Sequence, residues 1–204
     1  KGNVVAPDKV LKEYGSEILR LWVAMSDYQS DLKISDNILK QNGELYRKIR
    51  NTARFLLANI DGLEKLVEVE KLGVLDKWIL EKAKRVFDEI ESSFKIYEFS
   101  KGLNRLNNFL VVDLSGIYLD VCKDRLYCDD KNDIHRTASQ TAMAMITKKL
   151  ISTLACILTY TMDELLDYAP KIIKGDAKDI FDFEKNNLPD VKSEIKDELF
   201  VEAK

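Results

Sequence analysis

The stretch SDNILKQNGELYRKIRNTARFLLANI, residues 35–60, decides the fold that we expect. Its apolar residues recur every three or four positions, which places them on one face of an α-helix. Ser35 or Asp36 can cap this helix, which would be about 37 Å long at 1.5 Å per residue. An amphipathic helix of this length cannot bury its apolar face alone, so it must pack against other helices. The apolar face consists of Leu39, Leu45, Tyr46, Ile49, Ala53, Leu56, Leu57 and Ile60.

The same periodicity extends in both directions along the chain. Downstream, it predicts helices over residues 75–97 and 99–126, a third opening at Thr137, and a short last one that begins at Thr161 or Asp163 and ends before Pro170. Upstream, it predicts a short helix that starts at Pro7 and stops at Gly15, then a second one capped by Ser16. The brief alternation of apolar and polar residues over 31–35 indicates a short strand.

Long amphipathic helices joined by short polar loops predict an all-α fold, an antiparallel helical bundle. The predicted helices end before Pro170, and a tail follows them. The tail has little periodicity except at 191–200, where a further element could start.

Composition points to a globular protein of the cytoplasm. Hydrophobic residues make up 46% of the chain, charged residues 33%, and the net charge is −3. No apolar run approaches the roughly 20 residues of a membrane span, and no secretory signal is visible. The three cysteines, Cys122, Cys128 and Cys156, form no C-x-x-C pair, and with His135 as the only histidine we expect no metal site.

Motifs of known catalytic chemistry are missing from this sequence. It contains no phosphate-binding glycine loop, no H-E-x-x-H and no G-x-S-x-G. Acidic pairs such as Asp88-Glu89 are adjacent in sequence, so on a helix they point apart and make poor acid/base pairs. We therefore expect no catalytic residue in this chain.

A row of basic residues is the strongest functional feature that the residues themselves offer. Lys40, Arg47, Asn51 and Arg54 form one stripe on the long helix, and Arg50 lies about 60° round from it. Arginines with an interleaved amide suit contacts with phosphates and with exposed bases of single-stranded RNA. Two alternatives stay open: a solvated surface paired with glutamates, or a helical protein-interaction module with an acidic partner.

A second basic patch lies at the end of the helix predicted over 99–126. It holds Lys123 and Arg125, next to Tyr127. These two residues are weaker candidates for RNA binding, because a pairing of Arg125 with a buried aspartate that supports the bundle is an equal alternative.

Several strings of residues resemble one family, the isoleucyl-tRNA synthetases of class I. The opening KGNVVAP resembles the continuation of the K-M-S-K-S loop, and YGSEILRLW, residues 14–22, resembles a string shared by the isoleucine, valine and leucine enzymes. The strings that favour the isoleucine enzyme are SDY at 26–28 with ISD at 34–36, YRKIRNTARFLL at 46–57, LDKW at 75–78, YEF at 97–99, and DLS through YLD to KDRLY within 113–127. The match runs in order from Lys1 to about Pro170; the corresponding region of a valyl enzyme stays open as an alternative.

This resemblance implies a part of a longer enzyme that follows its catalytic domain. Residues 1–35 would be a stem-contact segment, 36–170 an anticodon-binding bundle, and 171–204 the start of a further region. Gly2 and Asn3 would be remnants of the ATP-binding loop, while the catalytic and editing domains would lie upstream. The parent enzyme would use ATP with magnesium to attach isoleucine to tRNA, and this part would need no cofactor itself.

The resemblance also implies where tRNA would bind. Lys9, Lys12 and Lys33 would lie near the inner stem of the tRNA. The basic row and, less strongly, the pair Lys123 and Arg125 would face the anticodon arm. The expected partner is an isoleucine-accepting tRNA, with neither DNA nor a membrane as a partner, and the expected state is a monomer.

Overall fold

Helix α3 (Asp36–Asn59) is the central long helix of the computed structural model, which describes residues 6–29, 31–131 and 133–195. Ser35 caps it: its backbone is extended, and its hydroxyl oxygen accepts a hydrogen bond from the Ile38 backbone N–H at 3.3 Å. The apolar stripe of α3 is buried, with Ile49 and Leu56 fully enclosed. Both the helix and its cap confirm the prediction.

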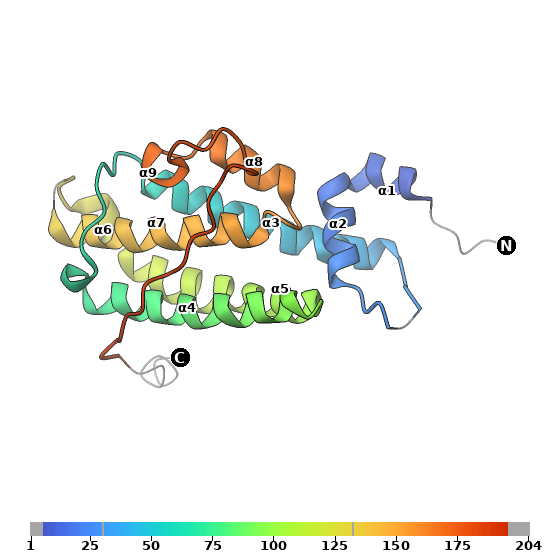
Figure 1. The fold of residues 1–204 in the computed structure, drawn as a ribbon, viewed down its shortest axis with the longest axis horizontal. Helices are drawn as coiled ribbons and strands as arrows, with labels where there is room; N and C mark the ends of the chain where they lie inside the picture. The colour runs from blue at the N-terminus through green and yellow to red at the C-terminus, as the bar shows by residue number, and fades with distance from the viewer. Residues whose placement is uncertain (1–5, 30, 132, 196–204) are drawn as a thin grey trace.

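The described residues are helical wherever they are regular, which confirms the all-α prediction. Helices α4, α5 and α7 lie alongside one another in the bundle, and α3 passes behind α7 (Figure 1). Among the described residues, no helix is both long and apolar enough to cross a membrane. The remaining elements are α1 (Pro7–Tyr14), α2 (Ser16–Met25), η1 (Val69–Lys71), α4 (Val74–Lys95), α5 (Phe99–Asn108), η2 (Phe109–Leu119), α6 (Asp120–Cys128), α7 (Ile134–Leu154), α8 (Thr159–Asp167) and α9 (Lys171–Lys174).

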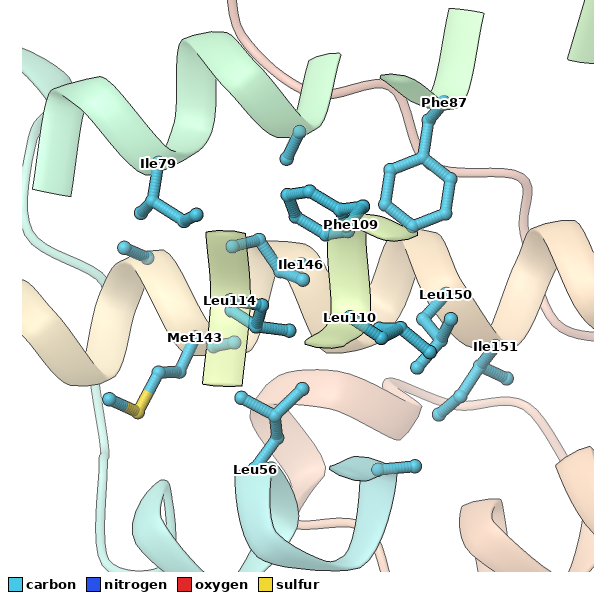
Figure 2. Packing of buried hydrophobic residues seen from close by; sticks show 14 of the residues in the cluster. Leu56, Ile79, Phe87, Phe109, Leu110, Leu114, Met143, Ile146, Leu150 and Ile151 are labelled. Atoms are coloured by element: carbon cyan, nitrogen blue, oxygen red, sulfur yellow. The ribbon is translucent and has the colours of Figure 1, made fainter. Parts of the chain in front are cut away.

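The core of the bundle forms where α3, α4, η2 and α7 meet. Phe87 of α4 and Phe109 of η2 pack edge to face, with ring centroids 6.1 Å apart. Figure 2 shows aliphatic side chains from all four elements gathered between the helices, with this pair of rings at one side of the cluster. The labelled aliphatic residues, all buried, are Leu56, Ile79, Leu110, Leu114, Met143, Ile146, Leu150 and Ile151. Burial of these side chains is the main stabilising contribution to the bundle.

One helix was predicted over 99–126, and the structure forms a continuous helical segment whose centre is π-helical. Segment η2 has the wider turn of a π-helix, in which backbone bonds reach five residues back. Gly116 fits this turn, because a Cβ on it would lie 2.9 Å from the carbonyl oxygen of Val111, five residues earlier. A sequence pattern with a period of 3.6 residues does not distinguish this wider turn from an α-helix.

Helices α1 and α2 join the bundle through the corner between α7 and α8. Gly15, at φ +85°, makes the sharp turn between α1 and α2 that a side chain would strain. The Arg20 guanidinium then donates to the backbone carbonyls of Cys156 and Ile157, at 3.0 and 2.8 Å. The Glu17 carboxylate accepts from the Thr161 backbone N–H at 3.2 Å. These bonds fix α2 against the bundle.

The tail runs as an irregular strap across α7 and α4 (Figure 1). Buried Lys149 of α7 donates to the Glu91 carboxylate of α4 at 2.6 Å, and Lys185 of the strap pairs with the same carboxylate at 3.2 Å. The Ser193 backbone N–H donates to Glu81 at 2.9 Å. Ile180, Leu188 and Val191 of the strap are buried and belong to the hydrophobic core. Residues 191–195 are not helical, and the rest of the element considered at 191–200 lies outside the described residues.

Several local predictions were wrong. The strand expected at 31–35 is not formed, because a strand needs a neighbouring backbone and no described segment supplies one. Helix α7 starts earlier than Thr137: the Asp133 side chain caps it by accepting from the backbone N–H groups of His135 and Arg136. Ser16 is the first residue of α2 and its side chain makes no capping bond, and α8 begins at Thr159.

Candidate nucleic-acid interface

The basic row lies on the face of α3 opposite its buried stripe. Lys40, Arg47, Asn51 and Arg54 are all exposed there, as their helical spacing predicted. Arg50, to one side of the row, is half-buried. The helix thus presents cationic side chains to solvent along much of its length.

Two of these arginines meet carboxylates. Arg47 pairs with Glu44, one turn earlier on the same helix, and both side chains are largely exposed. Arg50 donates to both carboxylate oxygens of Glu164 on α8, at 2.9 and 3.0 Å. The hydrogen bond to Glu164 raises the pKa of Arg50 above its usual value. Ion pairs this exposed contribute little stability, about 0–1 kcal/mol, so another anion can displace them cheaply.

Arg54 lies one turn beyond Arg50, beside a hollow between α3 and α8. The hollow has a volume of about 750 Å³, and the residues that line it include Arg50, Arg54 and Glu164. Within the described part of the chain, no hydrogen bond or ion pair holds the Arg54 side chain. Its guanidinium is therefore available to an anion from solvent.

The second basic patch divides into two different environments. Lys123 is exposed and pairs with Asp120 one turn earlier, at 2.6 Å. Arg125 reaches inward instead: it donates to the Ser139 hydroxyl at 3.4 Å and lies 3.9 Å from the Asp76 carboxylate. The pairing of Arg125 with a buried aspartate, which the sequence left open, is thus present.

Asp76 is the centre of a buried polar network at this end of the bundle. It is fully enclosed, and its Oδ1 accepts from the Tyr118 and Ser139 hydroxyls at 2.7 and 2.9 Å. Its Oδ2 has no hydrogen-bond partner, so Arg125 is the cation that faces it. Burial is the main cause that raises the pKa of Tyr118 well above its usual value, with the Asp76 charge adding to it. The network joins α4, η2, α6 and α7.

The cations of the N-terminal segment precede α3 in the chain, and Lys33 lines a hollow together with Glu44, the partner of Arg47. Lys9 and Lys12 are exposed on α1, and Lys33 lies in the irregular segment before α3, at a hollow of about 550 Å³. Gly2 and Asn3, interpreted as remnants of an ATP-binding loop, lie outside the described residues.

Residues that could coordinate a metal do not gather in the part of the chain that the structure describes: no group of three His, Cys, Asp or Glu side chains is placed to hold an ion. Cys122 is buried, with burial the main cause that raises its pKa, while Cys128 and Cys156 are exposed. His135 is exposed.

Two residues of the α3–α8 hollow were missed by the sequence reasoning. Glu164 lies 114 residues from Arg50, and Tyr168 ends α8 with its ring in solvent. Neither belongs to a basic row or to a recognisable motif. Only the packing of α8 on α3 brings them to the interface.

Comparison with known families matches two parts of the chain. The family model described as the anticodon-binding domain of tRNA ligase matches residues 76–202, and the model of class I tRNA synthetases (I, L, M and V) matches residues 1–35. The chain belongs to the anticodon-binding domain family of tRNA ligases. The family match covers the bundle from α4 onward and the strap, whereas α3 lies between the two matched ranges.

Curated relatives of this anticodon-binding domain are isoleucine–tRNA ligases. The chain is 79% identical to the enzyme of Aliarcobacter butzleri and 61% identical to that of Nitratiruptor sp., in both cases over its full length. It spans only 22% of the length of each of them.

A solved structure shares the fold. A chain in the ternary complex LeuRS–tRNA–LeuAMS of Agrobacterium radiobacter K84 superposes with a TM-score of 0.60 at 12% identity, over 94% of this chain and 22% of that chain. At this identity the likeness shows that the helical arrangement recurs, and nothing more.

Proposed function

We propose that this anticodon-binding domain holds the anticodon arm of an isoleucine-accepting tRNA within a longer isoleucine–tRNA ligase. The exposed cationic row on α3 is the observation that carries this proposal. Phosphate contacts from such a row supply affinity, and a fixed arm lets the acceptor end of the tRNA reach the site of aminoacylation.

The identity of the relatives supports isoleucine as the amino acid. The remainder of the enzyme activates isoleucine with ATP and magnesium and transfers it to the tRNA, in the cytoplasm and as a monomer. This chain supplies no catalytic group to that reaction. Its 79% identity to one isoleucine–tRNA ligase favours this enzyme over the valine one.

Within the row, the residues differ in what they can offer. Arg54 and Lys40 are exposed and have no partner among the described residues, so they are ready for phosphate. Arg47 and Arg50 must exchange a carboxylate for phosphate, at small cost because their pairs are exposed. Lys123, Lys9, Lys12 and Lys33 extend the proposed contact surface, whereas Arg125 supports the bundle.

A binding series with an isoleucine tRNA transcript tests the proposal. We expect a dissociation constant in the micromolar range or weaker, and a steep loss of affinity between about 50 and 200 mM salt, because phosphate contacts release counterions. Absence of binding at low salt would contradict the proposal and favour the protein-interaction module with an acidic partner.

Two activity measurements delimit the role of the domain. The chain alone should not support isoleucine-dependent pyrophosphate exchange, because the proposal places activation elsewhere in the enzyme. The full-length ligase should charge tRNA with isoleucine rather than valine. Exchange by the chain alone, or a preference for valine, would contradict the assignment.

A further inference from the structure

A second hollow, of about 740 Å³, lies at the end of the bundle where α2 packs, and its lining is almost entirely apolar. Helix α2 and the residues after it form one wall. The turn between α4 and α5 and the corner between α7 and α8 form the others (Figure 1). The apolar and aromatic side chains that line it include Leu19, Val23, Tyr28, Tyr97, Phe99 and Ile157.

Three large side chains of this hollow remain in solvent. Val23, Tyr28 and Tyr97 are each more than half exposed, although burial of such side chains is favourable. Single exposed apolar residues are normal on a protein surface, whereas several gathered in one hollow are typical of a surface on which another protein packs.

Tyr97 also has a backbone conformation that a tyrosine rarely adopts. Its φ is +63°, and it follows the last turn of α4, where the Glu98 backbone N–H donates to the Ser93 carbonyl at 2.9 Å. Glycine is the usual residue at this position of a helix end, because a side chain is strained there. The Tyr97 ring packs edge to face on Phe99, with centroids 6.1 Å apart. A strained residue with a large exposed ring indicates a role outside the packing of this chain.

Charge is nearly absent from the lining. Among the described residues that line the hollow, Arg20 alone is charged, and its guanidinium already donates to the Cys156 and Ile157 carbonyls. An RNA backbone needs cations for its phosphates, so it gains little here. Apolar side chains together with tyrosines match the core of a protein interface instead.

The hollow lies across the boundary between the two ranges that the family models match. Its α2 wall belongs to residues 1–35, which match the class I synthetase model. Tyr97, Phe99 and Ile157 belong to residues 76–202, which match the anticodon-binding model. The chain spans only 22% of the length of its curated relatives, so most of such an enzyme lies outside it.

We propose that this hollow is the docking surface for the rest of the synthetase domain in the full-length ligase. Residues 1–35 are continuous with that domain, which makes it the nearest partner for the α2 wall. The partner surface presents apolar side chains that fill the hollow and cover Val23, Tyr28 and Tyr97. This inference rests on the part of the proposed function that places the chain within a longer isoleucine–tRNA ligase, and it does not depend on tRNA binding.

Hydroxyl-radical oxidation of the full-length ligase, without tRNA and read by mass spectrometry, tests whether the hollow is covered. Tyr28 and Tyr97 are 65% and 67% exposed in this chain, and Tyr127, on α6 at the opposite end of the bundle, is 67% exposed. Each oxidation rate is normalised to that of the denatured enzyme. Tyr28 and Tyr97 should react about five-fold or more slowly than Tyr127, because the core of a protein interface excludes water. Equal rates would overturn the proposal.

A charge placed in the hollow tests the same contact from the α2 side. Val23→Asp in the full-length ligase should raise the oxidation rate of Tyr97 to that of Tyr127, because a buried carboxylate without a partner is costly and the contact opens. Val121→Asp is the matched control and should keep Tyr97 protected, since Val121 is a helical valine of similar exposure, 53% against 57%, at the other end of the bundle. Circular dichroism checks that both variants are folded. Protection of Tyr97 that survives Val23→Asp would contradict the contact.

Other occupants of the hollow give different results. Protection of Tyr97 that requires added tRNA would identify an RNA surface, and protection that grows with enzyme concentration would identify a second copy of the ligase. Either result would overturn the proposal.

Failure of this inference is distinguishable from failure of the proposed function. A full-length ligase that binds its tRNA but leaves Tyr97 unprotected contradicts the docking surface alone. One that protects Tyr97 but binds no tRNA contradicts the role of the α3 row alone.

Discussion

Arg50 and Arg125 each pair with a carboxylate of another helix, and each side chain is 35% exposed, but their partners differ. Glu164, which faces Arg50, is 48% exposed, whereas Asp76, which faces Arg125, is fully buried. A buried carboxylate left without its cation is costly, while an exposed one is solvated by water. The burial of the partner therefore decides whether an arginine can be released to RNA or must stay to support the bundle.

The largest effect expected from this difference is on stability. Asp76→Ala should lower the free energy of unfolding by about 3–5 kcal/mol, because it leaves the buried Tyr118 and Ser139 hydroxyls without their acceptor and opens a gap in the packing. Urea denaturation measures this loss. Glu164→Ala is the matched control and should change the free energy by less than about 1 kcal/mol. Equal losses would erase the distinction between the two surfaces.

Methionine in place of each arginine keeps most of the volume and removes the charge, so it sharpens the comparison. Arg125→Met should destabilise the bundle by about 1–3 kcal/mol, because Asp76 then faces no cation. It should leave tRNA affinity unchanged under conditions where the chain is folded. Arg50→Met should do the reverse, with weaker tRNA binding and a stability change below about 1 kcal/mol. Chemical denaturation and tRNA titration of both variants measure these effects. Weaker tRNA binding by folded Arg125→Met, together with unchanged binding by Arg50→Met, would contradict the comparison.

A smaller effect on stability is expected when the pH is lowered, and it arises at the end of the bundle where Arg125 lies. Hydrogen bonds from the Arg136 and His135 backbone N–H groups lower the pKa of Asp133, the cap of α7. Because its folded pKa lies below its unfolded pKa of about 3.9, the cap stabilises the fold above about pH 4 and loses this effect as pH falls through the folded pKa.

Replacing the charged aspartate cap of α7 by an uncharged serine cap tests this pH dependence. Asp133→Ser keeps a capping oxygen without a charge, so its melting temperature should depend less on pH below about 4 than that of the wild type. Ser35, the cap of α3, already lacks a charge, and Ser35→Ala should lower stability by a similar amount at every pH. An unchanged acid profile in Asp133→Ser would remove this carboxylate from the account.

The parts of the fold that followed from the sequence are those governed by local pattern. Helix α3, its buried stripe and its Ser35 cap were predicted because one periodicity and one capping residue specify them. The π-helical turn at Gly116 and the irregular segment at 31–35 were not, since both depend on backbone geometry that a 3.6-residue or a two-residue period does not encode.

Only the α3 side of the candidate site could be predicted from the sequence. The cationic row of α3 can be identified from spacing alone, because it lies on a single helix. Glu164 and Tyr168 belong to α8, which is far from α3 in sequence. Asp76, whose burial gives Arg125 a different role from the arginines of α3, lies 49 positions before Arg125. Contacts between distant segments depend on how the helices pack, and composition offers no sign of them.

The salt dependence of tRNA binding tests the central claim most directly, namely that the α3 cations meet phosphates and Arg125 does not. The logarithm of affinity should fall linearly with the logarithm of salt concentration, and Arg54→Ala should reduce the slope by about 1, as the loss of one phosphate contact requires. Arg125→Met should leave the slope unchanged. A slope that Arg54→Ala does not alter, or that Arg125→Met reduces, would contradict the account.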